Sequence, residues 1–199
     1  LADIGTLVML GRTLQEQGIF RQCPEERDRY YVKVPAFSFS KLSGMDAYLS
    51  PEMKSTGEAI GYDKKLHRAA YKAMTASGLR LRNYGTVLVS VADEDKEETV
   101  PLIRRFYQMG FNIEATTLTG EVLKEHWIRT RIRRKPSEGS DEVLDSIRAG
   151  YVSYVINTRA VLSGVHYGDG VAIRRAAARN NVTMLTSLDT VRMLLDVLE

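Results

Sequence analysis

The sequence predicts an α/β fold, a doubly wound sheet of five parallel strands, and three observations support this prediction. Residues 87–91 (VLVSV) form a short apolar run of the kind found in a strand that is buried on both faces. After a polar turn, Asp95 and Glu98 have the spacing of a capping box at a helix start. Alternation of strand and helix then continues to the end of the chain, which predicts parallel strands, right-handed crossovers and helices on both faces of the sheet.

The remaining elements of this unit follow the same alternation. Further strands are expected at residues 112–117, 129–135, 151–157 and 182–187, and helices at 96–109, 120–127, 142–149, 171–180 and 189–198. In an open parallel sheet, ligands bind at the carboxyl ends of the strands. The residues expected at that edge are 91–96, 116–119, Lys135, 157–159 and 186–187.

Before residue 85 the pattern is less regular. Helices are expected over residues 1–17, which Gly18 would end, and over 63–77, with Asp63 as the N-cap. Residues 30–42 alternate as in a strand, although Pro35 indicates an edge strand or a break. We therefore expect a smaller α+β unit at residues 1–83 and a second domain at 84–199. The first unit has little apolar material for its size, so we do not expect it to fold by itself.

The overall composition is that of an ordinary soluble globular protein. Of the 199 residues, 44% are hydrophobic and 27% charged, and no apolar run approaches the roughly 20 residues that a membrane helix needs. The chain has neither a signal-peptide pattern nor an initial Met, so we expect a cytoplasmic segment of a longer protein. Cys23 is the only cysteine, which excludes an internal disulfide and fits a reducing compartment. Its proline and acidic neighbours argue against a catalytic thiol.

The distribution of charge argues against a nucleic-acid partner. Residues 1–84 contain 13 basic and 9 acidic side chains, and residues 85–199 contain 15 and 16, so neither half is strongly basic. A local exception is RTRIRRK at residues 129–135, with five cations in seven positions. This run fits an edge strand protected by charge as well as it fits an anion site.

Polar residues at the carboxyl edge of the expected sheet favour anion binding over acid–base chemistry. Lys96 stands in the first turn of its helix, where a cation is disfavoured, so it faces either solvent or an anion. Lys135, several hydroxyls and an amide join it at this edge, with no catalytic carboxylate pair and no histidine. We therefore predict an anion-binding site without catalytic or metal-ligating residues.

Two groups of motifs resemble the large chain of glutamine-hydrolysing carbamoyl-phosphate synthase. VKVPAFSFSKL (32–42) and PEMKSTGEAIG (51–61) resemble the end of its second ATP-grasp unit. VINT (155–158), IRRAA (173–177) and LTSLDT (185–190) resemble its C-terminal regulatory domain, which has the methylglyoxal-synthase-like fold. The resemblance implies an ATP-grasp remnant at 1–83 and an allosteric domain at 84–199.

The resemblance also implies an effector site. The matching residues are the lysine of the first helix turn, two threonines of ATTLTG, the lysine of RKPSEG and the asparagine of INT: Lys96, Thr116, Thr119, Lys135 and Asn157. Leu118 replaces a glycine that is usual in the family, which predicts crowding at the phosphate, and Arg159 replaces a hydroxyl residue of some members. Ser140 and Asp141 replace a common arginine–proline pair. Met184 replaces a tyrosine of the ornithine-activated members, which argues against ornithine here.

For function, the resemblance implies a regulatory segment that binds a phosphorylated nucleotide-type effector such as UMP, IMP or phosphoribosyl pyrophosphate. The parent chain would be an ATP-dependent ligase that uses Mg or Mn and serves arginine and pyrimidine biosynthesis. Expected partners are the rest of the large chain and the glutaminase small chain. The segment itself is expected to be non-catalytic and to hold no cofactor, since the residues that bind nucleotide and metal would precede Leu1. MKSTGE (53–58) lacks the glycine spacing of a Walker motif.

Two other functions stay open. A methylglyoxal synthase would share the fold, but its chemistry needs a carboxylate base beside the phosphate. The strand end at residues 157–159 (NTR) offers none. An interaction domain without a ligand is the third possibility.

Overall fold

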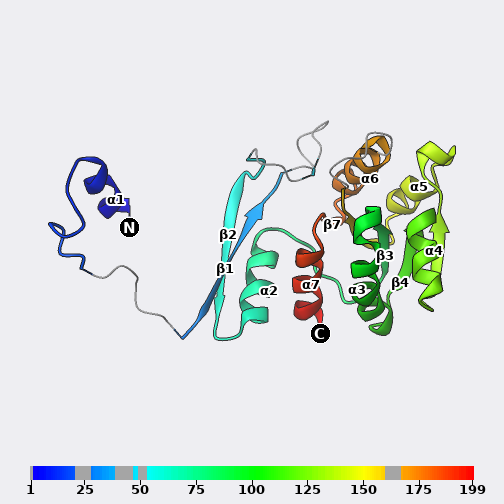
Figure 1. Ribbon diagram of the computed structural model, residues 1–199, viewed down its shortest axis with the longest axis horizontal. Helices are drawn as coiled ribbons and strands as arrows, with labels where there is room; N and C mark the ends of the chain where they lie inside the picture. Colours follow the sequence, from blue (N-terminus) through cyan, green and yellow to red (C-terminus); the bar gives the residue numbers. More distant parts are fainter. Residues whose placement is uncertain (1, 21–27, 39–46, 49–52, 160–166) are drawn as a thin grey trace.

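The computed structural model describes residues 2–20, 28–38, 47–48, 53–159 and 167–199. Its main feature is a five-stranded sheet with the strand order β5-β4-β3-β6-β7, in which every neighbouring pair is parallel. Helices cover both faces of this sheet (Figure 1). The predicted fold class is therefore confirmed.

The elements of this unit alternate as expected, with shifts at their ends. The strands are β3 (Thr86–Ser90), β4 (Asn112–Thr116), β5 (Thr130–Arg133), β6 (Val152–Asn157) and β7 (Thr183–Leu185), and the helices are α3 (Lys96–Gln108), α4 (Thr117–Glu125), α5 (Glu142–Arg148), α6 (Tyr167–Arg179) and α7 (Leu188–Leu198). Short 3-10 helices, η1 (Asp93–Asp95) and η2 (Pro136–Glu138), follow β3 and β5. Both α4 and α6 begin three or four residues earlier than expected, which brings their first turns to the strand ends.

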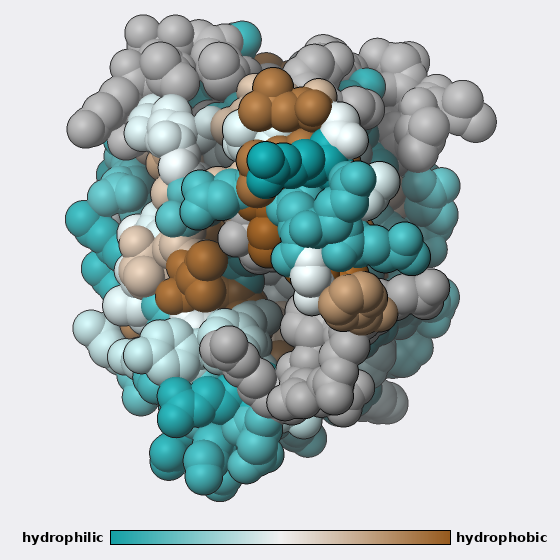
Figure 2. Space-filling model, turned by 90° about the vertical axis from the view of Figure 1, so that its left-hand side faces the viewer, coloured by the Kyte–Doolittle hydropathy of each residue, from teal (hydrophilic) through white to brown (hydrophobic). Residues whose placement is uncertain are grey.

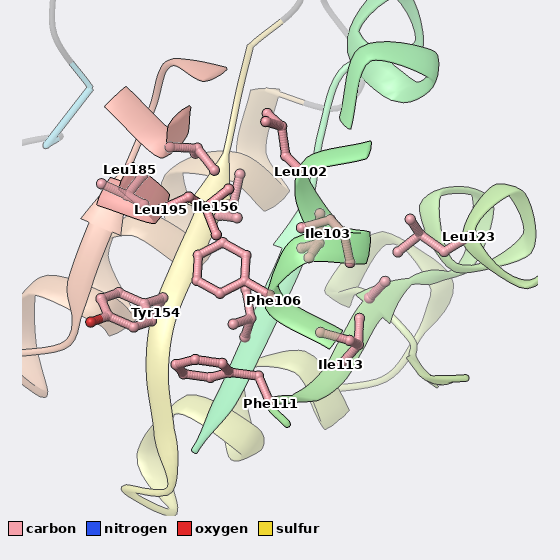
Figure 3. Close-up of a cluster of buried hydrophobic side chains, with 14 of the residues drawn as sticks. Leu102, Ile103, Phe106, Phe111, Ile113, Leu123, Tyr154, Ile156, Leu185 and Leu195 are labelled. Atoms are coloured by element: carbon pink, nitrogen blue, oxygen red, sulfur yellow. The ribbon is translucent and has the colours of Figure 1, made fainter. Parts of the chain in front are cut away.

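The core lies on both faces of the sheet. Val87 and Val89 of β3 belong to one hydrophobic cluster and Leu88 to the other, because successive side chains of a strand point to opposite faces. Helices α3, α4 and α7 contribute to the first cluster, and α5 and α6 to the second. Figure 3 shows the first cluster, where Phe106 of α3 packs edge-on against Phe111 at a ring-centroid distance of 5.2 Å.

The first unit is a hairpin covered by one helix. Strand β1 (Tyr30–Ala36) pairs with β2 (Gly57–Asp63) in antiparallel fashion, and α2 (Leu66–Ala76) packs on the pair. Strand β2 was not expected from the sequence, and Pro35 lies inside β1, where an edge strand tolerates it. Figure 2 views the molecule from the side on which α1 and then the hairpin lie, and hydrophobic and hydrophilic residues are mixed over this face.

Two predicted helix caps were wrong. Asp63 does not cap α2, because β2 continues to Asp63; Lys65 is the N-cap, and its backbone N–H donates to Asp63 Oδ1. The capping box at Asp95 and Glu98 is not formed, since Asp95 makes no side-chain cap hydrogen bond, although a helix does begin at Lys96.

The N-terminal helix is shorter than predicted. Helix α1 (Ala2–Met9) ends before Gly11, which has a φ of +90°, a backbone angle that glycine adopts readily. The helix has no buried residue and lies apart from the other elements in Figure 1. The prediction of a helix over residues 1–17 was therefore wrong in its second half.

The segment between the two units is bound to the second. The Tyr154 hydroxyl donates to the carbonyl of Arg82, and the Thr183 hydroxyl donates to the carbonyl of Arg80. Helix α2 also contacts α7. The division of the chain at residues 83 and 84 stays a prediction.

Some expectations fall outside the described residues. They concern Cys23 and its neighbours, the end of the expected extended segment at 39–42, the beginning of PEMKSTGE at 51–52, and His166. Among the residues that the structure does describe, no helix is long and apolar enough to cross a membrane.

Candidate functional site

A cavity of about 120 Å³ lies at the carboxyl ends of β3, β4 and β6. All five residues that the resemblance implied are among those that line it: Lys96, Thr116, Thr119, Lys135 and Asn157. The sequence therefore located these side chains correctly in relation to one another. Whether they bind an effector stays a prediction.

Lys96 is the first residue of α3 and is mostly buried. Its side chain is 15% exposed, and its Nζ lies 2.7 Å from Oδ1 of Asp93, whose own side chain is 85% exposed. Of the two surroundings that the sequence left open, an anion is therefore present in the form of the Asp93 carboxylate, and both side chains line the cavity.

Lys135 follows β5, is the N-cap of η2 and lines the cavity. Its side chain is also 15% exposed, and its Nζ lies 3.9 Å from Oδ2 of Asp169. Asp169 in the first turn of α6 is buried and accepts a hydrogen bond from the backbone N–H of Ser137. This carboxylate therefore fixes η2, and with it Lys135, against α6.

Thr116 and Thr119 supply hydroxyls between the two lysines. Thr116 ends β4, Thr119 lies in the first turn of α4, both are buried, and their Oγ1 atoms are 3.4 Å apart. The first N–H groups of a helix have no partner within the helix, so they favour a negative charge at this end. Gly120 lets this turn approach β5, because a Cβ there would lie 2.9 Å from Cγ1 of Ile132. Leu118 lines the cavity while half exposed, at the position where crowding was predicted.

Asn157 is held by two hydrogen bonds at the end of β6. Its Nδ2 donates to the carbonyl of Ser90 at 2.9 Å, and its Oδ1 accepts from Nη1 of Arg174 at 2.7 Å. Arg174 is 2% exposed and lines the cavity. Gly170 leaves room for its guanidinium, since a Cβ at Gly170 would lie 2.9 Å from Nη1. Arg174 was not predicted as a site residue, although it belongs to the IRRAA motif at residues 173–177.

Two carboxylates lie in the lining of the cavity, and whether this edge lacks a catalytic carboxylate pair stays a prediction. Asp93 and Asp169 both line the cavity, although Asp93 lies against Lys96, and Asp169 against Lys135 and the Ser137 hydroxyl. Four of the lining residues are basic, the two lysines with Arg159 and Arg174, so the charge of the lining is positive. In the part of the chain that the structure describes, no group of three or more His, Cys, Asp or Glu side chains could hold a metal ion.

Comparison with known proteins assigns the second unit to a domain family. Residues 98–186 match the family model of the MGS-like domain. The chain contains an MGS-like domain. Four of the five predicted site residues lie inside this match, and Lys96 lies just before it. The match does not include residues 1–97, so the ATP-grasp remnant stays a prediction.

The methylglyoxal synthase among the similar solved structures agrees with this fold. The crystal structure of methylglyoxal synthase from Elizabethkingia anophelis NUHP1 has a TM-score of 0.50 and 20% sequence identity, covering 58% of this chain and 79% of that one. The crystal structure of ForH has a TM-score of 0.46 and 18% identity, covering 58% and 80%. At such low identity, the likeness to the methylglyoxal synthase shows the MGS-like fold alone.

Proposed function

We propose that this chain is the regulatory C-terminal segment of a carbamoyl-phosphate synthase large chain and that its cavity binds a phosphorylated nucleotide-type effector. The observation that supports this most is the placement of Lys96 and Lys135, both 15% exposed, in the lining of one small cavity. Two buried ammonium groups close to one cavity favour a ligand with at least one phosphate.

The proposed binding mode assigns a separate task to each group. Lys96 and Lys135 neutralise the phosphate, and the hydroxyls of Thr116 and Thr119 donate hydrogen bonds to its oxygens. The N-terminal ends of α3 and α4 add the positive ends of their dipoles. Asn157 is held by Ser90 and Arg174, so its amide is rigid enough to recognise the ribose or a second phosphate.

In this proposal the segment regulates but does not catalyse. The parent chain would make carbamoyl phosphate in the cytoplasm with ATP, Mg or Mn, bicarbonate and glutamine, for arginine and pyrimidine biosynthesis. Its partners would be the rest of the large chain and a glutaminase small chain. Effector binding would alter the stability of the contacts between the MGS-like domain and the first unit, and through them the upstream ATP sites.

Titration of the purified chain with UMP, IMP, phosphoribosyl pyrophosphate and ornithine tests the proposal. We expect saturable binding of at least one of the three phosphorylated compounds and none of ornithine. The purified chain should also form no carbamoyl phosphate from ATP and bicarbonate. If none of the phosphorylated compounds binds, the effector function is wrong, and formation of carbamoyl phosphate would contradict the non-catalytic assignment.

Asp169 supports a second candidate, a methylglyoxal-synthase-type lyase. Its carboxylate lies beside Lys135 in the cavity, which supplies the carboxylate that the strand end at residues 157–159 lacks. Against this role, both of its oxygens already accept hydrogen bonds from Ser137. Release of inorganic phosphate from dihydroxyacetone phosphate, abolished in Asp169→Asn, would favour the lyase; no turnover would leave the regulatory proposal.

A further inference from the structure

An aromatic side chain of the first unit contacts two arginines of the cavity. The ring centroid of Tyr48 lies 5.2 Å from Cζ of Arg159 and 5.3 Å from Cζ of Arg174. Both arginines line the cavity, whereas Tyr48 does not. Tyr48 instead lines an adjoining hollow that shares Thr158 and Arg159 with the cavity. It would therefore act on a ligand only through the arginines.

The position of Tyr48 is itself supported by its neighbours. Ala47, the preceding residue, is 2% exposed. The carbonyl of Tyr48 accepts a hydrogen bond from Nζ of Lys54, which also belongs to the first unit. The backbone at Tyr48 is thus held by the burial of Ala47 and by the hydrogen bond from Lys54.

Stacking on an aromatic ring and binding of an anion use different parts of a guanidinium. The planar group stacks through its face, and its five N–H groups donate in the plane. Arg174 shows this division, since its Nη1 donates to Asn157 while its Cζ lies near the Tyr48 ring. An arginine whose face is covered by a ring can donate in its own plane at the same time. Because its side chain is already restricted, it loses less conformational entropy when an anion binds.

We propose that Tyr48 is a positioning residue for the anion site, which it completes from outside the MGS-like domain by holding Arg159 and Arg174 toward the cavity. This inference rests on the proposed function, because it presumes that the cavity binds a phosphorylated compound. It implies that the isolated MGS-like domain binds that compound more weakly than the longer chain does. It also gives the first unit an indirect part in binding the ligand, through Arg159 and Arg174.

The test compares three single variants of the full chain by calorimetry. Tyr48→Phe keeps the aromatic face, Tyr48→Leu keeps apolar bulk without it, and Tyr71→Leu removes an exposed tyrosine of α2 far from the cavity as the matched control. The probes are inorganic phosphate, UMP, IMP and phosphoribosyl pyrophosphate at one salt concentration, and the affinity compared is that of the probe that wild type binds most tightly.

We expect Tyr48→Phe and the control to stay within about twofold of wild type and Tyr48→Leu to bind about 5- to 10-fold more weakly. Wild-type affinity in Tyr48→Leu, or an equal loss in Tyr48→Phe, would overturn the positioning role. Circular dichroism and thermal melting check folding, and Tyr48→Met replaces Tyr48→Leu if the latter does not fold. Lys96→Ala distinguishes failure of the positioning role from failure of the anion site. If Lys96→Ala weakens binding while Tyr48→Leu does not, only the positioning role is wrong. If wild type binds none of the probes, the anion site itself is overturned.

Discussion

Arg174 donates a hydrogen bond of 2.7 Å from Nη1 to Oδ1 of Asn157, and both side chains are buried. The bond joins α6 to the end of β6 at the floor of the cavity. Arg174→Met should lower the free energy of unfolding by about 1–3 kcal/mol, because a buried acceptor loses its charged donor. Urea unfolding measures this loss. Arg179→Met, which changes an exposed arginine of the same helix, should stay within about 0.5 kcal/mol of wild type; similar losses in both would contradict the role of the bond.

A glycine controls how closely α2 packs on the hairpin. A Cβ at Gly61 would overlap the backbone carbonyl of Ala69 and the backbone nitrogen of Ala73, whereas a Cβ at Gly57 would meet nothing within 4 Å. Gly61→Ala should therefore destabilise the protein by about 1–3 kcal/mol, as overpacking does, and Gly57→Ala should not. Thermal melting of the two variants makes the comparison within one strand. Equal melting temperatures would show that α2 does not pack on β2 in this way.

The buried Glu114 predicts a particular response to acid. Burial acts to raise its pKa, but hydrogen bonds from Arg133 and Tyr151, together with the charge of Arg133, outweigh burial and hold the pKa below its ordinary value of 4.5. Since the folded-state pKa is lower than that of the unfolded chain, the stabilisation is complete above about pH 4.5 and is lost as the pH falls through the folded-state pKa.

The free energy of unfolding of wild type should therefore fall more steeply below about pH 4.5 than that of Glu114→Gln, whose side chain does not titrate. Urea unfolding at several pH values between about 3 and 7 measures both slopes. Parallel curves for the two proteins would show that the Arg133 interaction does not persist in solution.

The sequence predicted the parallel sheet because two local patterns agree in the second unit: the apolar strands, and the polar turns with helix starts that follow them. Four of the five residues at 87–91 are apolar, and polar turns and helix starts follow each strand. Strand β2 was missed because GEAIGYD contains two glycines and alternates weakly, so its pairing with β1 and its contact with α2 determine its conformation. The helix caps were predicted least well. Asp63, for example, ends β2 and forms a salt bridge with Lys72 instead of capping α2.

The residues of the cavity could be predicted where they lie in recognised family motifs that mark the site, and the other residues could not. The five residues predicted to bind an effector came from the resemblance, and the topology brings them to one edge. Arg174 and Asp169 were missed because a helix that starts beyond a long loop gives no local sign of which strand end its first turns approach. Tyr48 lies in an irregular segment, where periodicity carries no information about contacts.

Calorimetric titration of Lys96→Ala against wild type tests the proposed anion site most directly. The probe is the compound among UMP, IMP and phosphoribosyl pyrophosphate that wild type binds most tightly, at one fixed salt concentration. A hydrogen bond to a charged group contributes about 1.5–3 kcal/mol, so Lys96→Ala should bind about 10- to 100-fold more weakly. Lys124→Ala, on the exposed end of α4, should bind like wild type. Equal affinities for Lys96→Ala and wild type, with Lys135→Ala and Thr116→Val also unchanged, would contradict a phosphate site in this cavity.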